Sequence, residues 1–455
     1  MSDVQATFVE GYNLYTEGRE AEALACFDAV ISASPDYWQA RNNRAVLLQT
    51  AERYDEAMLD AQHMLLLDAN NASTHAMHAR ISLRLNRFAD ALASYARVRE
   101  LDPAYPLDVY EEAFCRLSLG DYAAGWPLHE ARWQTSSMQA TTAQLQQRGY
   151  TQPMWLGKES LAGKTIFLWP EQGHGDTLQF CRYVHVVQQL GAKVILATNQ
   201  AMMRLLQNAF THPDTQVVLD LMSSPYTFDF HCPLMSLPLA CGTDRLEKIP
   251  LRVPYIFADE QGRQDMQTRV QAIANAALPS AMRVGLVWAG GLRPNQPELQ
   301  SIDTARSLRL EQFAPLLALA QTSEVQFFSL QLGEPANQLQ SHIQQGLQAG
   351  SPIANSPIAD LTSQLHDWAD TAALIDNLDL VISVDTAVAH LAAAMGKPTW
   401  ILSRFNGCWR WLDGRDDSPW YPTVRLFRQS TRGDWASVVS DLAAALAAQL
   451  KARHA

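Results

Sequence analysis

Small side chains recur at a fixed spacing along roughly the first 130 residues of the chain. One column, whose members lie 34 residues apart, consists of Ala23, Ala57, Ala91 and Gly125. A second column with the same spacing consists of Gly11, Ala45, Ala79 and Ala113. Bulky residues at such positions would force neighbouring helices apart, so the pattern predicts helical hairpins whose two helices approach closely there.

A period of 34 residues is that of the tetratricopeptide repeat. Pro35 and Pro103 are predicted to end the second helix of the first and third repeats, because proline removes a helical hydrogen bond. The second repeat has Ala69 at the proline position, and the fourth unit departs most from the pattern. About four units are expected over residues 1–133. They would form a superhelix whose concave face holds another polypeptide.

The hydrophobic pattern changes after a polar stretch that is rich in Ser, Thr and Gln. Short β-branched or aromatic runs such as KTIFLW and AKVILAT then alternate with helical stretches, which is typical of parallel βα units. The runs form two groups, 164–254 and 283–429. Two Rossmann-like, doubly wound halves facing a cleft are therefore expected. The predicted domains are residues 1–133, a linker at 134–152, a first half at 153–258 and a second half at 259–455.

Composition narrows the classes of partner. The net charge of −12 and the absence of a Lys/Arg cluster disfavour nucleic acid as a partner. The six cysteines show no metal-binding spacing, which fits reduced thiols better than disulfides or a zinc site. The chain begins without a signal-peptide pattern and has no apolar run near the ~18 residues of a membrane span. We expect a cytoplasmic protein without integral membrane association.

The first candidate site follows the run KTIFLW. Gly173, His174, Gly175 and Asp176 precede a helical pattern, and two glycines allow the backbone to approach a ligand closely. A helix N-terminus also favours an anion. Asp176 is thus placed to act on a substrate, although it could equally serve as the N-cap of the helix.

The second candidate site is the loop after the run VGLVW. It begins at Trp288 and carries Arg293 and Arg306, whose guanidinium groups could bind phosphate oxygens. Either arginine could instead be an ordinary surface residue.

The third candidate site is a strand end that runs into a helix. Asp385 or Thr386 would cap this helix, and free N–H groups from Ala387 onward would accept a phosphate. His390 lies one turn further along the same side. The alternative is a capping aspartate with a buried core histidine. A later aromatic and basic stretch, Trp409 to Tyr421, could stack on a sugar or a nucleobase or pack a domain joint.

These motifs together resemble a known family. The loop GHGD, the segment VDTAVAHLAAAMGKPTW and the arginine before SLRLEQF look like bacterial glycosyltransferase family 9, whose type members are the lipopolysaccharide heptosyltransferases. The resemblance spans roughly residues 157–450. It implies a GT-B fold with the nucleotide-sugar donor in the second half.

The resemblance also implies roles for individual residues. Asp176 corresponds to the base for the acceptor hydroxyl, and Arg306 corresponds to the basic residue that contacts the donor phosphates. Asp385, Thr386 and Ala387 match the turn that binds the diphosphate. This chain has Ala387 in place of the family's glycine, and arginine where the lipopolysaccharide enzymes usually have lysine.

The expected function is metal-independent transfer of a sugar from a nucleotide-sugar to an acceptor hydroxyl, without a cofactor. The order of the domains resembles that of the O-linked N-acetylglucosamine transferases and of bacterial protein or flagellin glycosyltransferases. The acceptor is therefore expected to be a protein or peptide on the concave face of the repeats. Two alternatives are an inactive interaction scaffold and a transferase that acts on a glycan or lipid-linked acceptor.

Overall fold

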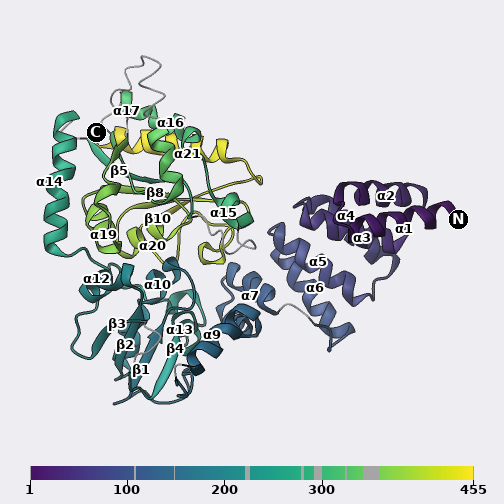
Figure 1. The fold of residues 1–455 in the computed structure, drawn as a ribbon, viewed down its shortest axis with the longest axis horizontal. Coiled ribbons are helices and arrows are strands. Elements are labelled where there is room, and N and C mark those ends of the chain that lie inside the picture. Colours follow the sequence, from purple (N-terminus) through teal and green to yellow (C-terminus); the bar gives the residue numbers. More distant parts are fainter. Residues whose placement is uncertain are drawn as a thin grey trace. The chain divides into compact units, whose positions relative to one another are not determined.

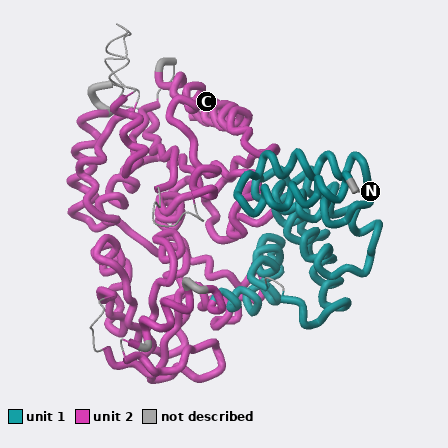
Figure 2. The backbone as a smooth tube through the Cα atoms, turned by 45° about the vertical axis from the view of Figure 1, so that its right-hand side comes forward, with its two compact units in different colours: residues 1–132 teal, residues 133–455 magenta. Residues whose placement is uncertain are grey.

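The structure is a computed structural model. It describes residues 2–106, 109–147, 149–220, 226–277, 281–291, 300–322, 325–341 and 358–453. The chain divides into two compact units, Met1–Arg132 and Trp133–Ala455, which Figure 2 shows in different colours. Each unit has its own core, and each is described separately below.

The first unit consists of antiparallel helical hairpins in which each helix packs on the next along the chain (Figure 1). Its helices are α1 (Ser2–Thr16), α2 (Glu20–Ala33), α3 (Trp38–Thr50), α4 (Tyr54–Leu67), α5 (Ala72–Arg84), α6 (Phe88–Leu101), α7 (Val109–Ser118) and α8 (Tyr122–His129). Helices α2 and α6 end shortly before Pro35 and Pro103, as the sequence predicts. The tetratricopeptide-like array is thereby confirmed.

Both columns of small residues lie at helix contacts. The alanines of both columns are fully buried. A Cβ atom added to Gly11 would lie 2.8 Å from the Cβ atom of Cys26, and one added to Gly125 would lie 2.7 Å from a methyl group of Leu117. Larger side chains would push the paired helices apart, so the 34-residue spacing records the points of closest approach.

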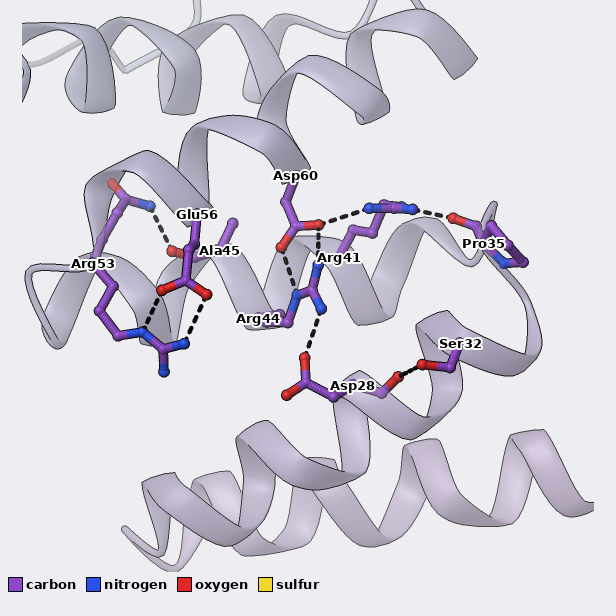
Figure 3. Close-up of polar contacts among 10 residues, drawn as sticks. Asp28, Ser32, Pro35, Arg41, Arg44, Ala45, Arg53, Glu56 and Asp60 are labelled. Atoms are coloured by element: carbon purple, nitrogen blue, oxygen red, sulfur yellow. Dashed lines mark hydrogen bonds and ion pairs between the residues drawn. The ribbon is translucent and has the colours of Figure 1, made fainter.

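A buried ion-pair network joins three helices of the first unit (Figure 3). The carboxylate of Asp60 on α4 is completely buried and accepts hydrogen bonds from Arg41 at 2.8 Å and from Arg44 at 2.7 and 2.8 Å. Arg44 also donates to Asp28 on α2, and Arg41 donates to the backbone oxygen of Pro35. Since each arginine reaches back to the preceding hairpin helix or its end, the network fixes the second hairpin against the first.

The segment predicted to be a linker contains helix α9 (Ser136–Gln147). Leu145 and the following Tyr150 pack against a cluster that includes Phe167, Trp169 and Phe228. The polar composition is therefore misleading: this segment belongs to the second unit because its few apolar residues cover one sheet.

The second unit contains two parallel sheets, one in each half. The first sheet has the strand order β3-β2-β1-β4, with β1 (Thr165–Trp169), β2 (Lys193–Thr198), β3 (Thr215–Leu219) and β4 (Phe230–Pro233). Its helices are α10 (His174–Phe180), α11 (Tyr183–Gln189), α12 (Gln200–Ala209) and α13 (Leu237–Ala240). Helix α14 (Glu260–Ala277) begins the second half, at the helical stretch between the two groups of runs.

The second sheet has the order β10-β9-β8-β5-β6-β7 and is also parallel. Its strands are β5 (Met282–Val287), β6 (Val325–Ser329), β7 (Ile358–Asp360), β8 (Leu380–Val384), β9 (Thr399–Ser403) and β10 (Val424–Arg428). Its helices are α15 (Gln300–Arg306), α16 (Ala314–Leu317), α17 (Leu319–Thr322), α19 (Trp368–Asp376), α20 (Ala387–Ala394) and α21 (Trp435–Ala452). Short 3₁₀ helices are η1 (Glu130–Gln134), η2 (Leu234–Ser236), η3 (Leu246–Lys248), η5 (Leu310–Phe313), η6 (Glu334–Ala336), η7 (Thr362–Gln364) and η8 (Trp409–Trp411).

The fold class predicted from the sequence is confirmed: a helical repeat unit precedes two doubly wound parallel sheets. The cysteines are free thiols; Cys115, Cys181 and Cys232 are buried, and the other three are partly buried. No helix within the described ranges is both long enough and apolar enough to cross a membrane.

Candidate functional site

The first part of the site is the start of α10, directly after β1. Gly173 is the N-cap residue, and Asp176 is the third residue of the helix. The Oδ2 atom of Asp176 accepts a hydrogen bond of 3.0 Å from the backbone N–H of Gly173. Asp176 therefore caps the helix from inside its first turn, and about a fifth of its side chain is exposed to solvent.

The second part of the site is the start of α20, directly after β8. Thr386 is the N-cap residue, but its hydroxyl group hydrogen bonds to the Ser383 hydroxyl at 3.0 Å and does not cap the helix. Among the described residues, no acceptor is recorded for the backbone N–H groups of Ala387 and Val388. This helix end thus presents free donors, as a phosphate site requires.

Arg306, at the end of α15, lies beside this helix end. Its Nη1 atom donates to the backbone oxygen of Asp385 at 2.9 Å, and its Nη2 atom pairs at 2.7 Å with the buried carboxylate of Asp303. Its Nε atom is buried and has no hydrogen-bond partner among the described residues. A Cβ atom on Gly290 would lie 2.7 Å from that Nε atom, so glycine is needed at this position. Arg306 is held in place, and its buried Nε–H group remains unused among the described residues.

Helices α10 and α20 pack against each other between the two sheets (Figure 1). A Cβ atom on Gly175 would lie 3.0 Å from the Cδ2 atom of His390 and 3.6 Å from the Cα atom of Ala387. The two predicted loops, more than 200 residues apart in the sequence, therefore meet. The structure brings Asp176, Arg306 and the start of α20 into one region.

His390 is a buried packing residue of this region. Its ring stacks on Trp411 with the centroids 5.0 Å apart, and its Nδ1 atom forms a 3.0 Å hydrogen bond with the Tyr421 hydroxyl. Burial lowers the pKa of His390 well below its usual value, and the positive charges of Arg410, Arg182 and Arg306 lower it further. The imidazole is therefore neutral at pH 7, which agrees with the alternative of a core histidine.

Arg410 belongs to the aromatic and basic stretch of the sequence analysis, which does not predict its pairing with Asp176. It comes from η8, after β9, and its Nη2 atom pairs with the Oδ1 atom of Asp176. Its Nη1 atom contacts the Cys408 sulfur at 3.1 Å, and its guanidinium lies 4.4 Å from the ring centroid of Trp409. Although burial opposes the charged form, Asp176 helps to raise the pKa of Arg410 above its ordinary value.

Arg182 is a second residue missed at the sequence level, and it ties the two halves together. It is almost fully buried and donates to the backbone oxygen of Trp420 at 2.7 Å and to the Tyr255 hydroxyl at 3.0 Å. Its guanidinium also lies 4.6 Å from the ring centroid of Tyr421. The aromatic stretch after β9 thus packs at the joint between the two halves, which is one of the two roles that the sequence analysis considers for it.

The side chain of Trp288 lies in the core of the second half. Its ring is completely buried in the core of the second half, and its indole N–H faces the backbone oxygen of Pro335 at 3.3 Å. The ring therefore packs in the core and has no exposed surface here, and its contact with the donor stays a prediction. Arg293 lies outside the described residues.

His174 links the halves at the edge of the site. The indole N–H of Trp368 on α19 donates to its Nδ1 atom at 3.2 Å, and its Nε2 atom lies 2.8 Å from the Asn199 amide. Burial lowers the pKa of His174. These contacts make His174 a joint residue. Across the described part of the chain, no group of three or more His, Cys, Asp or Glu side chains could hold a metal ion.

Comparison with known proteins finds a family match in the second half of the chain that includes one part of this site, the start of α20. Residues 309–402 match the model of glycosyltransferase family 9 (heptosyltransferase), a range that includes Asp385, Thr386 and His390. The chain is 24% identical over 466 aligned positions to Protein FlbA of Caulobacter vibrioides, covering 96% of this chain and 72% of that protein.

Two further similarities cover one unit each. Over 91 residues, 20% of this chain and 13% of the relative, the chain is 35% identical to the TPR repeat-containing thioredoxin TTL4 of Arabidopsis thaliana. The structure of the E. coli ADP-heptose lipopolysaccharide heptosyltransferase II aligns with 64% of this chain and all of that one, at 12% identity and a TM-score of 0.43. The predicted joining of a tetratricopeptide array to a family 9 segment is confirmed by the family match and the repeat structure.

Proposed function

We propose that this protein is a glycosyltransferase that moves a sugar from a nucleotide-sugar to an acceptor hydroxyl. The observation that carries the proposal is a set of unused hydrogen-bond donors beside a carboxylate. The Nε atom of Arg306 and the N–H groups of Ala387 and Val388 lack acceptors among the described residues, and Asp176 lies on the adjacent helix. Buried donors without acceptors are costly unless a ligand satisfies them.

The donor diphosphate fits the unused hydrogen-bond donors. The N-terminus of α20 carries a partial positive charge, and the Arg306 guanidinium adds a full charge with directed N–H groups. When the bond between sugar and diphosphate breaks, negative charge accumulates on the departing nucleoside diphosphate. Donors that are fixed in advance stabilise this charge without reorganising, so the site requires no metal ion for this step.

Asp176 is the proposed general base. Its carboxylate would accept the proton of the acceptor hydroxyl as the oxygen attacks the anomeric carbon of the sugar. Such a group contributes about 10²- to 10⁴-fold to the rate. In this proposal the first half supplies the base and the second half binds the donor, as in the GT-B arrangement.

The repeat unit is the proposed acceptor-binding part. Stacked helical hairpins form an extended concave surface, which suits a peptide segment or a small domain better than a small sugar. A protein or peptide acceptor therefore accounts for an array of this kind on the same chain as a transferase.

The test compares Asp176→Asn with Asp214→Asn, which changes an exposed carboxylate in the same half. Release of nucleoside diphosphate from a panel of nucleotide-sugars is measured with a protein extract as the acceptor pool. We expect Asp176→Asn to lose at least about 100-fold of the rate while it still binds the nucleoside diphosphate, and Asp214→Asn to match the unmodified chain. Equal rates for the two variants would remove Asp176 from the mechanism.

A further inference from the structure

Both oxygens of the proposed base are occupied. The Oδ2 atom of Asp176 accepts the N–H of Gly173, and the Oδ1 atom pairs with Arg410. A carboxylate that is paired with an arginine is a weaker base, because its lone pairs are already engaged and are less able to accept the proton of an incoming hydroxyl group. For Asp176 to work as a base, the contact with Arg410 has to weaken when the substrates bind.

Arg410 is positioned to exchange partners. Its side chain is only about one-tenth exposed, and its buried Nε atom has no hydrogen-bond partner in the part of the chain that the structure describes. Apart from Asp176, its recorded contacts are soft ones: the sulfur of Cys408 and the faces of the Trp409 and Phe180 rings. Aromatic faces and a thiol stabilise the cation without fixing its hydrogen-bond direction. Asp176 is thus the only carboxylate that pairs directly with Arg410 among the described residues, although the charge of Asp385 also acts on Arg410.

Arg410 also lies close to the start of α20. The next residue, Trp411, stacks on His390 of that helix, and Gly175, which precedes Asp176, lies against Ala387 and His390. The charges of Arg410 and Arg306 both act on His390. A diphosphate at the start of α20 therefore lies within electrostatic reach of both arginines.

We propose that Arg410 is a shared cation, which neutralises Asp176 in the empty protein and moves to the donor diphosphate when the donor binds. This inference rests on the proposed function. A diphosphate carries more negative charge than a carboxylate, and its oxygens suit the guanidinium fork. The exchange frees the Oδ1 atom of Asp176, so donor binding activates the base. No covalent bond changes in this step.

The exchange predicts a linkage between Asp176 and anion binding. Because Asp176 competes with the diphosphate for Arg410, removing the charge of Asp176 should strengthen diphosphate binding. A purely structural ion pair predicts the reverse, since breaking it would disorder Arg410 and weaken binding. The sign of the change therefore separates the two roles.

The experiment measures binding of inorganic pyrophosphate to the full chain by titration calorimetry at low salt, for the unmodified protein, Asp176→Asn, Arg410→Gln and the double variant. We expect about 3- to 10-fold tighter binding for Asp176→Asn and about 10-fold weaker binding for Arg410→Gln. The double variant should bind as weakly as Arg410→Gln alone. Unchanged or weaker binding by Asp176→Asn overturns the proposal.

Controls separate this inference from the proposed function. Arg415→Gln, which removes a charge paired with the exposed Asp417, should leave binding unchanged. Arg410→Lys retains the charge and replaces the glutamine variant if that variant folds poorly. An intermediate affinity is expected for Arg410→Lys. If pyrophosphate binding depends on Arg306 but Asp176→Asn does not tighten it, only the shared-cation role is wrong. If neither pyrophosphate nor any of ADP, UDP and GDP binds, the proposed function is wrong as well.

Discussion

Two arginine–carboxylate clusters in this protein use the same residue types in opposite ways. In the repeat unit, the carboxylate of Asp60 accepts three N–H donors from Arg41 and Arg44, and no buried polar atom of these three side chains lacks a partner. In the second unit, the buried Nε atoms of Arg306 and Arg410 lack partners within the described ranges. The first cluster is closed, whereas the second has donors left over.

This difference distinguishes a structural network from a binding site. A buried ion pair compensates the cost of desolvation only when its remaining donors and acceptors are satisfied. The Asp60 cluster meets that condition without a ligand, so it holds helices together. Under the proposed function, a bound anion would satisfy the donors near α20. The two clusters therefore differ in the satisfaction of their donors and not in the presence of arginine.

The largest effect is expected from a variant that breaks the closed cluster around Asp60. Asp60→Ala leaves Arg41 and Arg44 without their buried partner, and we expect a loss of about 3–5 kcal/mol in the unfolding free energy of the repeat unit. Urea unfolding followed by circular dichroism measures this loss. Glu56→Gln, which opens an exposed pair with Arg53, should cost no more than about 1 kcal/mol. Nucleoside diphosphate binding should be unchanged in Asp60→Ala; weaker binding would show that the two clusters are not independent.

A smaller effect is expected from crowding the open cluster. In Gly290→Ala the added methyl group would lie 2.7 Å from the Nε atom of Arg306, so the guanidinium has to move. We expect a cost of about 1–3 kcal/mol in stability and roughly 10-fold weaker binding of nucleoside diphosphate. Gly291→Ala is the matched control, because its Cβ atom would meet nothing within 4 Å. Equal binding by the two variants would show that Arg306 does not need its present position.

The smallest expected effect concerns His390, which packs beneath the site. Its pKa is lowered in the folded protein, so the unfolded chain binds a proton near pH 6.5 that the folded protein does not bind. The stability contribution is complete above that pH and is lost as the pH falls, by up to about 1.4 kcal/mol per pH unit. The melting temperature should therefore fall more steeply between pH 7 and pH 5 for the unmodified protein than for His390→Gln. His212→Gln, which changes an exposed histidine, should follow the unmodified curve; parallel curves for all three would contradict the assignment.

The sequence predicts the four strands of the first sheet and the central strands of the second sheet, but it misses the two edge strands of the second sheet. β5, β8 and β9 are mostly apolar and almost entirely buried, as expected where helices cover both faces of the sheet. The two strands missed, β7 and β10, are the edges of the second sheet. β7 has three residues, and β10 places Arg425 and Arg428 among its apolar residues, so neither shows the expected run.

The sequence identifies the loops of the site better than the partners of their side chains. Asp176, Arg306 and Thr386 lie at element ends, where local pattern is informative. Arg410 reaches Asp176 across 234 residues, and no local pattern predicts such a pairing. Trp288 illustrates a second limit of local pattern. A tryptophan at a strand end has the same sequence pattern whether its ring packs in the core or faces a ligand. One signal for Arg410 exists in the sequence: it is an arginine between two tryptophans.

The central claim is that the start of α20 binds the diphosphate of a nucleotide-sugar. The most direct measurement is titration calorimetry of ADP, UDP and GDP against the full chain, Arg306→Gln and Arg309→Gln, the last of which removes an exposed arginine three residues away. The account predicts that at least one nucleoside diphosphate binds and that Arg306→Gln weakens its binding about 10- to 100-fold, with Arg309→Gln unchanged. Binding that is equal in all three proteins, or no binding of any of them, would contradict it.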